Sequence, residues 1–301
     1  MDLRHLRYFV VVAEELHFTK AAQRIGIAQP PLTFQIKALE TELGVQLFDR
    51  QPGRVTLTEP GKIYLEEVRA ILEHVRMAAL RCQLSAQGVT GRLNIGFTES
   101  ASFRGEVTST LHRYRSLFPG VDISLEENRT GPLLDSLRQG RIDIAFVRPP
   151  TNSDDEIRFV LLSTEPMVVV VPKGHRMESR DAVSLEELRD ELFVLYSRTT
   201  RSGLPEMVLS ACEASGFNPK VVQYAPQISS TINLVAGGLG ISIVPACMRS
   251  SRSDDVCYIP LSGDGANLVA SLGLAHRVKG LSPAAQNLLK LIPGVGVHES
   301  H

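Results

Sequence analysis

The chain has 301 residues, of which 43% are hydrophobic and 22% are charged, and its formal net charge is −1. This length predicts two or three folded units, and the composition excludes a disordered or a fibrous chain. The net charge at first argues against a nucleic-acid partner, but its distribution along the chain decides more than its sum.

The N-terminal residues predict a cytoplasmic protein. An Arg and a His precede only a short apolar run, and no small-residue cleavage site follows. No segment approaches the about 18 uninterrupted apolar residues that would span a bilayer. We therefore expect neither a secretory signal nor a membrane partner.

No pattern of cysteines or histidines predicts a metal site or a cofactor. The four cysteines (82, 212, 247 and 257) form no Cys-x-x-Cys and have no histidine at ligand spacing, and the eight histidines do not cluster. We expect reduced structural thiols. A redox pair of Cys247 and Cys257 is the alternative.

Residues 1–58 are predicted to form a compact head of short helices and a hairpin. Thr19, which we also expect among the DNA-binding residues, is expected to cap a helix that Gly26 ends. A second helix runs from the Pro30-Pro31 pair to about residue 43. This arrangement fits a helix-turn-helix, and its apolar face is formed by Leu32, Ile36, Leu39 and Leu43.

Polar residues on the second helix could read DNA. Gln29, Thr33 and Gln35 could bond base edges, and Lys37 lies on the same polar face. An ordinary helical hairpin with solvated polar residues fits the spacing equally well.

The hairpin that follows favours DNA. Arg50 and Arg54 flank a Pro-Gly turn, and they could lie against phosphates together with the Thr58 hydroxyl. Residues 1–58 hold seven Lys and Arg and six Asp and Glu. Because one nearly neutral head binds DNA weakly, tight binding would need several heads joined together.

Residues 59–90 are predicted to form a linker, most of it one long helix with an apolar stripe. The stripe follows three- and four-residue steps from Ile63 to Leu80, and Gly88 and Gly91 end the helix. Such a helix favours a homodimer seam.

Residues 91–301 are predicted to form an α/β domain of two lobes separated by a cleft. Lobe I takes about 91–162 and 268–301, and lobe II takes about 163–267, so the chain crosses twice. Strands are expected at 93–97, 122–127, 142–147, 167–172, 192–197, 221–224, 241–245, 256–261 and 269–277. Helices are expected at 102–117, 131–140, 184–191, 205–216, 230–238 and 282–292.

Side chains at the carboxyl ends of the first strands predict an anion site. Ser100 and Ser102 lie near a helix N-terminus, Thr130 follows the second strand, and Arg148 follows the third. The alternatives are a helix cap for the serines and a structural ion pair of Arg148 with Asp143 or Glu99.

The sequence from Leu6 to Arg50 (LRYFVVVAEELHFTKAAQRIGIAQPPLTFQIKALETELGVQLFDR) resembles the N-terminal domain of LysR-type transcriptional regulators. TLTEPG, GRLNIGF, RIDIAFVRPP and LVAGGLGISIVPA resemble later landmarks of that family, over the whole chain. The resemblance implies a winged helix-turn-helix that binds double-stranded DNA, a dimerising linker and a periplasmic-binding-protein-like effector domain. It also implies a tetramer, with RNA polymerase as a further partner.

The resemblance also assigns roles to residues. Contact with DNA falls on Gln29, Pro30, Pro31, Thr33, Arg50 and Arg54. Phe34 departs from the family, in which many members have Arg or Ser. It can contact a thymine methyl or pack within the head, and we expect the second.

The branch that regulates degradation of aromatic compounds and responds to muconate or benzoate looks most similar. In that branch, positions matching Ser100, Thr130 and Arg148 line the effector pocket, and Leu204 stands where an aromatic residue can occur. Arg198 and Arg201, in the same loop as Leu204, either contact the effector or face water. Effector binding would change lobe closure and thereby the spacing of the heads.

Two other classes compete with a regulator. An enzyme lacks support, because the chain has no nucleophile elbow, phosphate loop or His-Glu-x-x-His motif. A solute-binding protein would need only the two-lobed half, and the N-terminal head argues against it.

Overall fold

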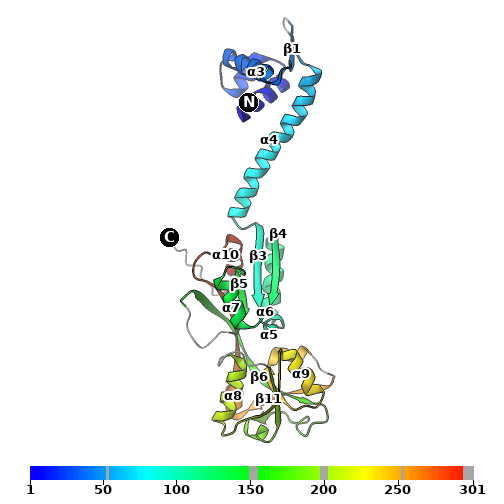
Figure 1. Ribbon diagram of the computed structural model, residues 1–301, viewed down its shortest axis with the longest axis vertical. Coiled ribbons are helices and arrows are strands. Elements are labelled where there is room, and N and C mark those ends of the chain that lie inside the picture. The colour runs from blue at the N-terminus through cyan, green and yellow to red at the C-terminus, as the bar shows by residue number, and fades with distance from the viewer. Residues whose placement is uncertain (52–53, 149–154, 197–202, 252–253, 294–301) are drawn as a thin grey trace. The chain divides into compact units, whose positions relative to one another are not determined.

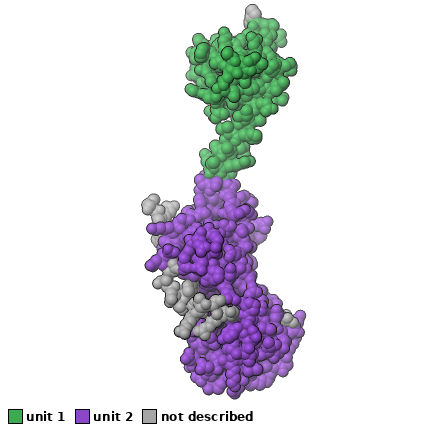
Figure 2. Space-filling model, viewed as in Figure 1, with its two compact units in different colours: residues 1–84 green, residues 85–301 purple. Residues whose placement is uncertain are grey.

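The computed structural model describes residues 1–51, 54–148, 155–196, 203–251 and 254–293. Its chain divides into two compact units, Met1–Leu84 and Ser85–His301, and the boundary falls near the end of one long helix. Figure 2 shows the two units in green and purple. The first is a helical head and the second is a two-lobed α/β domain, which confirms the predicted fold class.

Three helices and a hairpin form the head (Figure 1). They are α1 (Leu3–Glu15), α2 (Phe18–Ile25), α3 (Gln29–Leu43), β1 (Phe48–Gln51) and β2 (Arg54–Leu57). The strands pair antiparallel, from Phe48 opposite Leu57 to Gln51 opposite Arg54. The Phe48 ring contacts those of Phe9 and Phe18, with centroids 5.4 and 5.8 Å away, so the hairpin is fixed to the helices through an aromatic core.

Helix α2 begins at Phe18, directly after its N-cap residue, which is His17 and not Thr19. The His17 ring nitrogen accepts a hydrogen bond from the Lys20 backbone N–H, which leaves Thr19 inside the first turn. The prediction for Thr19 is therefore wrong, because an imidazole nitrogen can accept the bond that a hydroxyl usually accepts. Gly26, at φ +81°, ends the helix as expected.

Helix α3 has its predicted bounds. Pro30 and Pro31 occupy its first turn, where a missing amide hydrogen breaks no intrahelical bond. Leu32, Ile36 and Leu39 are fully buried, so this face of the helix fixes its orientation in the head.

Helix α4 (Glu59–Ala86) is the predicted linker helix. Its first half packs on the head through Leu65, Val68 and Leu72. Ile63 and Ile71 remain 65% and 43% exposed. Among the described residues, no helix is long and apolar enough to cross a membrane.

Lobe I is built on a sheet with the order β4-β3-β5-β12-β6. Its elements are β3 (Thr90–Phe97), α5 (Glu99–Ser102), α6 (Gly105–Leu117), β4 (Gly120–Glu127), α7 (Thr130–Arg138), β5 (Ile144–Val147), β12 (Val269–Arg277) and α10 (Pro283–Leu289). β3 pairs parallel with β4 and β5, and β12 pairs antiparallel with β5, so the C-terminal segment completes this sheet as predicted. The predicted helix 102–117 is instead two helices, α5 and α6.

Lobe II holds the remaining elements. They are β7 (Val183–Ser184), β8 (Leu192–Tyr196), α8 (Leu204–Ala214), β9 (Lys220–Ala225), α9 (Ile228–Ala236), β10 (Ser242–Pro245) and β11 (Val256–Ser262), with 3-10 turns at Glu186–Leu188, Ala246–Ser250 and Gly263–Asn267. The predicted helix 184–191 is wrong, because the segment buries only Leu185 and Leu188, which one turn can do.

One strand, β6 (Ile157–Pro172), belongs to both lobes (Figure 1). Its first ten residues pair with β12, and its last six pair with β10 and β11. The prediction of a strand at 167–172 covers only the second part. The lobes therefore share a continuous backbone ladder at the place where the cleft lies.

Candidate functional site

The outward face of α3 carries part of the predicted DNA-contact set. Pro30, Thr33, Phe34 and Lys37 fall within an arc of about 100°, opposite the buried face of the helix. Pro30 and Lys37 are exposed, as is the neighbouring Pro31, and Thr33 is half-buried. This face is free to approach another molecule.

The structure corrects the expectation for Phe34. Its side chain is 69% exposed, so it does not pack within the head. The core side of α3 is filled by aliphatic side chains, and position 34 points away from them.

At the start of α3, two of the predicted residues bond to each other. The Thr19 hydroxyl donates to Gln29 Oε1 over 2.8 Å, and both side chains are exposed. Gln35 differs, because its Oε1 contacts the His5 ring nitrogen. Gln35 is therefore held against α1 and does not belong to the outward face.

Arg50 is half-buried and is held against the head by Glu40. Its Nη2 donates to Glu40 Oε2 over 2.6 Å, and its guanidinium lies 4.9 Å from the centre of the Phe18 ring. The other oxygen of Glu40 accepts the backbone N–H groups of Leu47 and Phe48, at 3.0 and 3.1 Å. Glu40 thus joins α3 to β1 through three donors.

Two further predicted phosphate contacts differ from each other. The Thr58 hydroxyl donates to the Gln46 carbonyl over 2.7 Å and accepts the Gly61 N–H over 3.0 Å, so it fixes the start of α4. Arg54 is exposed at the start of β2 and is open to a phosphate.

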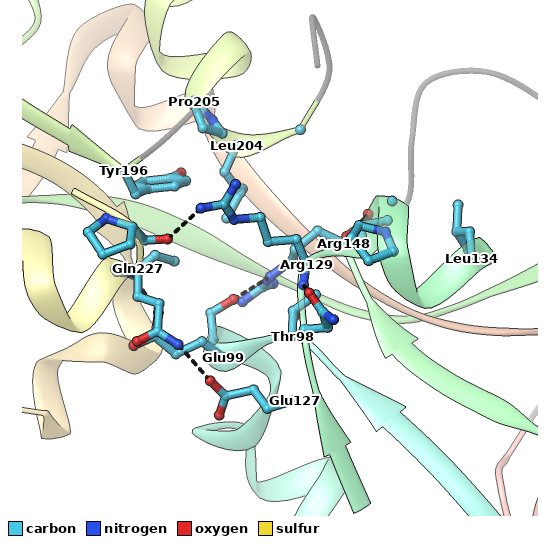
Figure 3. Close-up of a pocket in the computed structure, with 18 of the residues that line it drawn as sticks. Thr98, Glu99, Glu127, Arg129, Leu134, Arg148, Tyr196, Leu204, Pro205 and Gln227 are labelled. Carbon is cyan, nitrogen blue, oxygen red and sulfur yellow. Dashed lines mark hydrogen bonds between the residues drawn. The ribbon is translucent and has the colours of Figure 1, made fainter. Parts of the chain in front are cut away.

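A cavity of about 730 Å³ lies between the lobes (Figure 3). Lobe I contributes the ends of β3, β4 and β5 and the start of α7, and lobe II contributes the end of β8 and the starts of α8 and α9. Four predicted effector residues are in its lining: Ser100, Thr130, Arg148 and Leu204. Ser102 is not in this lining, and its hydroxyl donates to the Glu99 carbonyl over 2.7 Å. Arg198 and Arg201 lie outside the described residues.

Hydrogen bonds from the lining residues bridge the two lobes. The Glu99 carboxylate accepts the N–H groups of Ile228 and Ser229, at 2.7 and 3.0 Å, at the start of α9. Gln227 Nε2 donates to Glu127 Oε1 over 3.0 Å (Figure 3). Burial and the nearby charge of Glu99 raise the pKa of Glu127. The lobe interface is thus polar and includes backbone groups of α9.

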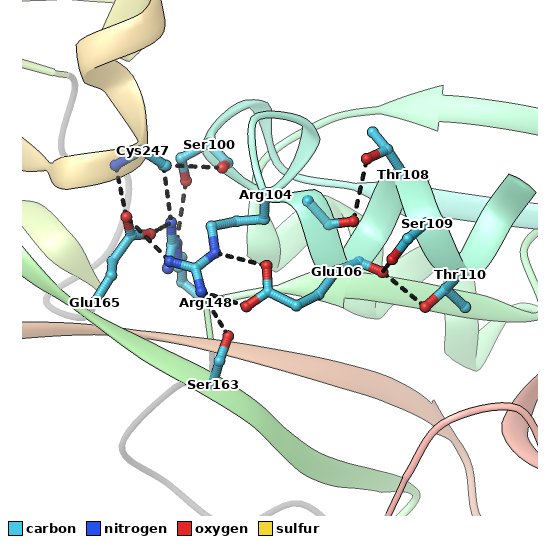
Figure 4. A network of polar contacts seen from close by, with 11 residues as sticks. Ser100, Arg104, Glu106, Thr108, Ser109, Thr110, Arg148, Ser163, Glu165 and Cys247 are labelled. Atoms are coloured by element: carbon cyan, nitrogen blue, oxygen red, sulfur yellow. Dashed lines mark hydrogen bonds and ion pairs between the residues drawn. The ribbon is translucent and has the colours of Figure 1, made fainter.

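Arg148 pairs with a carboxylate that the sequence analysis missed. Its Nη2 donates to Glu165 Oε1 over 2.8 Å and its Nε donates to Ser100 Oγ over 3.1 Å (Figure 4). The carboxylate that pairs with Arg148 is thus Glu165, and neither Asp143 nor Glu99, the partners considered from the sequence. Ser100, Arg148 and Glu165 are 1%, 6% and 5% exposed, so this is a buried ion pair fixed by a hydroxyl.

Glu165 also connects Arg148 to lobe II and to α6. Its Oε2 accepts the backbone N–H of Cys247 over 2.6 Å and lies 3.2 Å from Arg104 Nη1 (Figure 4). Arg104 Nη2 also donates to Glu106 Oε1 over 2.5 Å, and this hydrogen bond lowers the pKa of Glu106 to about 2. Two guanidinium groups and two carboxylates balance their charges in this network.

Three buried polar atoms in the cavity lining have no hydrogen-bond partner in the described part of the chain. They are Arg148 Nη1, the Tyr196 hydroxyl and Thr98 Oγ1. Burial raises the pKa of Tyr196, so its hydroxyl remains a donor. Leaving a buried polar group unpaired costs about 1–3 kcal/mol, so these three atoms are the polar groups of the lining that are open to a further partner.

The cysteines were considered above as a redox pair and as metal ligands. All four cysteines are free thiols. Cys247 donates to the Ser100 carbonyl and Cys257 to Glu178, and burial together with Glu165 raises the pKa of Cys247 to about 12. The residues that the structure describes contain no group of three or more His, Cys, Asp or Glu that could hold a metal ion.

Two family models match the chain. Residues 3–62 match the bacterial regulatory helix-turn-helix protein, lysR family, and residues 86–295 match the LysR substrate binding domain. The transcriptional regulator AlsR of Bacillus subtilis (strain 168) is 35% identical over 291 residues, covering 97% of this chain and 95% of AlsR.

Solved structures agree with these matches. CbnR, a LysR family transcriptional regulator, has a TM-score of 0.82 at 25% identity and covers 97% of this chain and 100% of its own. The effector-binding domain of BenM with its effector benzoate has a TM-score of 0.59 at 30% identity, over 67% of this chain and 90% of that domain. BenM of Acinetobacter baylyi is 36% identical over 264 residues, 87% of this chain and 86% of BenM.

The chain combines a head that exposes one face of α3 with a two-lobed domain that encloses a cavity. The family models match both parts. The relatives are transcription regulators and not enzymes. The chain belongs to the LysR family and is a DNA-binding transcription regulator with an effector-binding domain.

Proposed function

We propose that the effector of this regulator is a small organic carboxylate that binds in the cavity between the lobes. The observation that carries the proposal is the pair of unpartnered donors, Arg148 Nη1 and the Tyr196 hydroxyl, buried in the same lining. A carboxylate has enough lone pairs to accept from both. Ser100 and Glu165 already hold the guanidinium in place, so the ligand would find it oriented.

An aromatic carboxylate fits the rest of the lining. Leu134, Leu204 and Pro205 supply apolar surface to the cavity. The resemblance to regulators of aromatic-compound degradation and the benzoate bound by BenM support the same class. Benzoate and muconate are therefore the first candidates.

Calorimetric titration of the full chain tests the effector class. We expect benzoate or muconate to bind and the neutral isostere benzamide to bind at least tenfold more weakly, because benzamide lacks the charge that pairs with Arg148. Tyr196→Phe removes only the hydroxyl and should weaken binding about fivefold to tenfold. Tyr224→Phe, a change at a 45% exposed tyrosine, is the matched control. Equal affinity for benzoate and benzamide would contradict an anionic effector.

For DNA, we propose that α3 enters the major groove and that the hairpin lies on phosphates. The contact surface on α3 consists of Gln29, Thr33 and Lys37, and Arg54 of the hairpin extends it. Thr19 donates a hydrogen bond to Gln29, and Pro30 and Pro31 shape the first turn of the helix. Footprinting and gel-shift assays at fixed salt, on the promoter next to the gene of the protein itself, test this. Lys37→Gln should weaken binding and reduce the salt slope by about one. If a duplex without a site binds equally well, there is no sequence readout.

We further propose that α4 forms the homodimer, that dimers pair into a tetramer and that the complex acts on RNA polymerase in the cytoplasm, where promoter DNA lies. The exposed Ile63, Ile71 and Val75 support the seam, since they are apolar and do not pack on the head. Ile71→Glu should shift the sedimentation profile toward smaller species. Effector binding would then act through a different affinity for two lobe arrangements.

A further inference from the structure

Phe34 is an apolar side chain where the DNA-contact face would be expected to carry hydrogen-bonding groups. At 69% exposure, it is the most exposed large apolar side chain in the described part of the chain. A single exposed hydrophobic residue is common on any surface. Phe34, however, lies on the exposed face of α3, within the helix-turn-helix domain that matches the lysR family.

The neighbours of Phe34 limit what it can contact in a DNA groove. Pro30 lies one turn before it, Thr33 lies beside it, and Lys37 lies about one turn after it on the same face. Lys37 can reach a phosphate and Thr33 can reach a base edge, so Phe34 lies between two polar anchors. When they engage the duplex, the ring is placed in the groove.

A phenylalanine ring neither donates nor accepts a conventional hydrogen bond, so it cannot pair with the polar edges of guanine, cytosine or adenine. The 5-methyl group of thymine is the apolar group that the major groove offers. We propose that Phe34 contacts a thymine methyl and makes this regulator prefer thymine at one position of each half-site. The inference rests on the proposed placement of α3 in the major groove.

The test uses deoxyuridine, which differs from thymidine only by that methyl group. The preferred site is first selected from random duplexes with the full-length protein. Each thymine in it is then replaced singly by deoxyuridine, and Kd is measured by fluorescence anisotropy at fixed salt. We expect about a fourfold loss of affinity at one thymine per half-site, which is the equilibrium factor for burying one methyl-sized group.

Two variants separate the methyl contact from general weakening. Phe34→Ala should bind the thymine duplex more weakly and lose the thymine–deoxyuridine difference, because the ring is gone. Lys37→Gln should bind both duplexes more weakly and keep the difference, because its contact is with phosphate. Unchanged circular dichroism and melting temperature for Phe34→Ala would show that the head still folds, as expected for an exposed position.

Other results would overturn the inference. If the wild type binds its selected site but tolerates deoxyuridine at every position, Phe34 does not read a methyl group, and DNA recognition itself stands. If Phe34→Ala changes the oligomeric state and leaves the methyl effect intact, the ring contacts a second copy of the chain. If no site is selected at all, the proposed function of α3 fails together with the inference.

Discussion

Replacing Glu40 by alanine should loosen the head more than any change on its outward face. The side chain of Glu40 is only 12% exposed and accepts three hydrogen bonds, from the amides of Leu47 and Phe48 and from Arg50. Leu47 directly precedes β1, and Phe48 and Arg50 lie within it. The substitution leaves two amides and one guanidinium without their acceptor.

The size of the effect follows from those contacts. A hydrogen bond to a charged acceptor contributes about 1.5–3 kcal/mol, and solvent and local relaxation recover part of that after the substitution. A net loss of about 3 kcal/mol is expected, which corresponds to about a hundredfold increase in local opening. Glu40→Gln keeps a carbonyl oxygen for the amides and should lose less.

Hydrogen exchange followed by mass spectrometry is the suitable assay, because the chain contains no tryptophan and has two units that need not unfold together. Peptides from α1 to β2 should exchange about a hundredfold faster in Glu40→Ala, while peptides from the effector-binding domain remain unchanged. Glu66→Ala, a change at an exposed glutamate of α4, is the control. Acceleration of less than fivefold in the head would refute the reasoning about Glu40.

Three further predictions follow from contacts described above or implied by the backbone. Gly61→Ala should destabilise the head by at least about 2 kcal/mol, because a Cβ would overlap the carbonyl oxygen of Leu47; a wild-type melting curve would contradict this. Glu106 has a folded-state pKa of about 2, below its usual value of 4.5, so its ionised carboxylate stabilises the fold above about pH 4.5 and loses this effect as the pH falls toward 2. The difference in urea midpoint between wild type and Glu106→Gln should therefore shrink from pH 6 to pH 3. Iodoacetamide at pH 8 should label exposed Cys82 and leave Cys247 largely unlabelled, as peptide mass spectrometry can check.

Elements with local signals could be predicted from the sequence. The two prolines and Gly44 delimit α3, and the alternating apolar residues of β12 gave its bounds at Val269 and Arg277. The helix expected at 184–191 had charges without a broad apolar face and was not formed. Periodicity works where burial is periodic, and it fails in short segments whose burial depends on distant strands.

The candidate sites show the same division. Ser100, Thr130 and Arg148 could be placed together because the carboxyl ends of parallel strands meet at one edge. Glu165 and Tyr196 could not, because they come from β6 and β8, whose positions depend on how the chain passes between the lobes. In the head, a charge pattern favours Arg50 as a phosphate contact, and only the fold shows that Glu40 already holds it.

The return of β12 and α10 to lobe I has a consequence for synthesis of the protein. β12 supplies the partner of β5, and α10 packs on β3, about 190 residues after β3 itself in the chain. During translation, the head has all its own strands and helices soon after residue 84, whereas lobe I lacks part of its sheet until residues 269–289 leave the ribosome. A nascent chain can therefore carry a folded head before lobe I can close the cavity between the lobes.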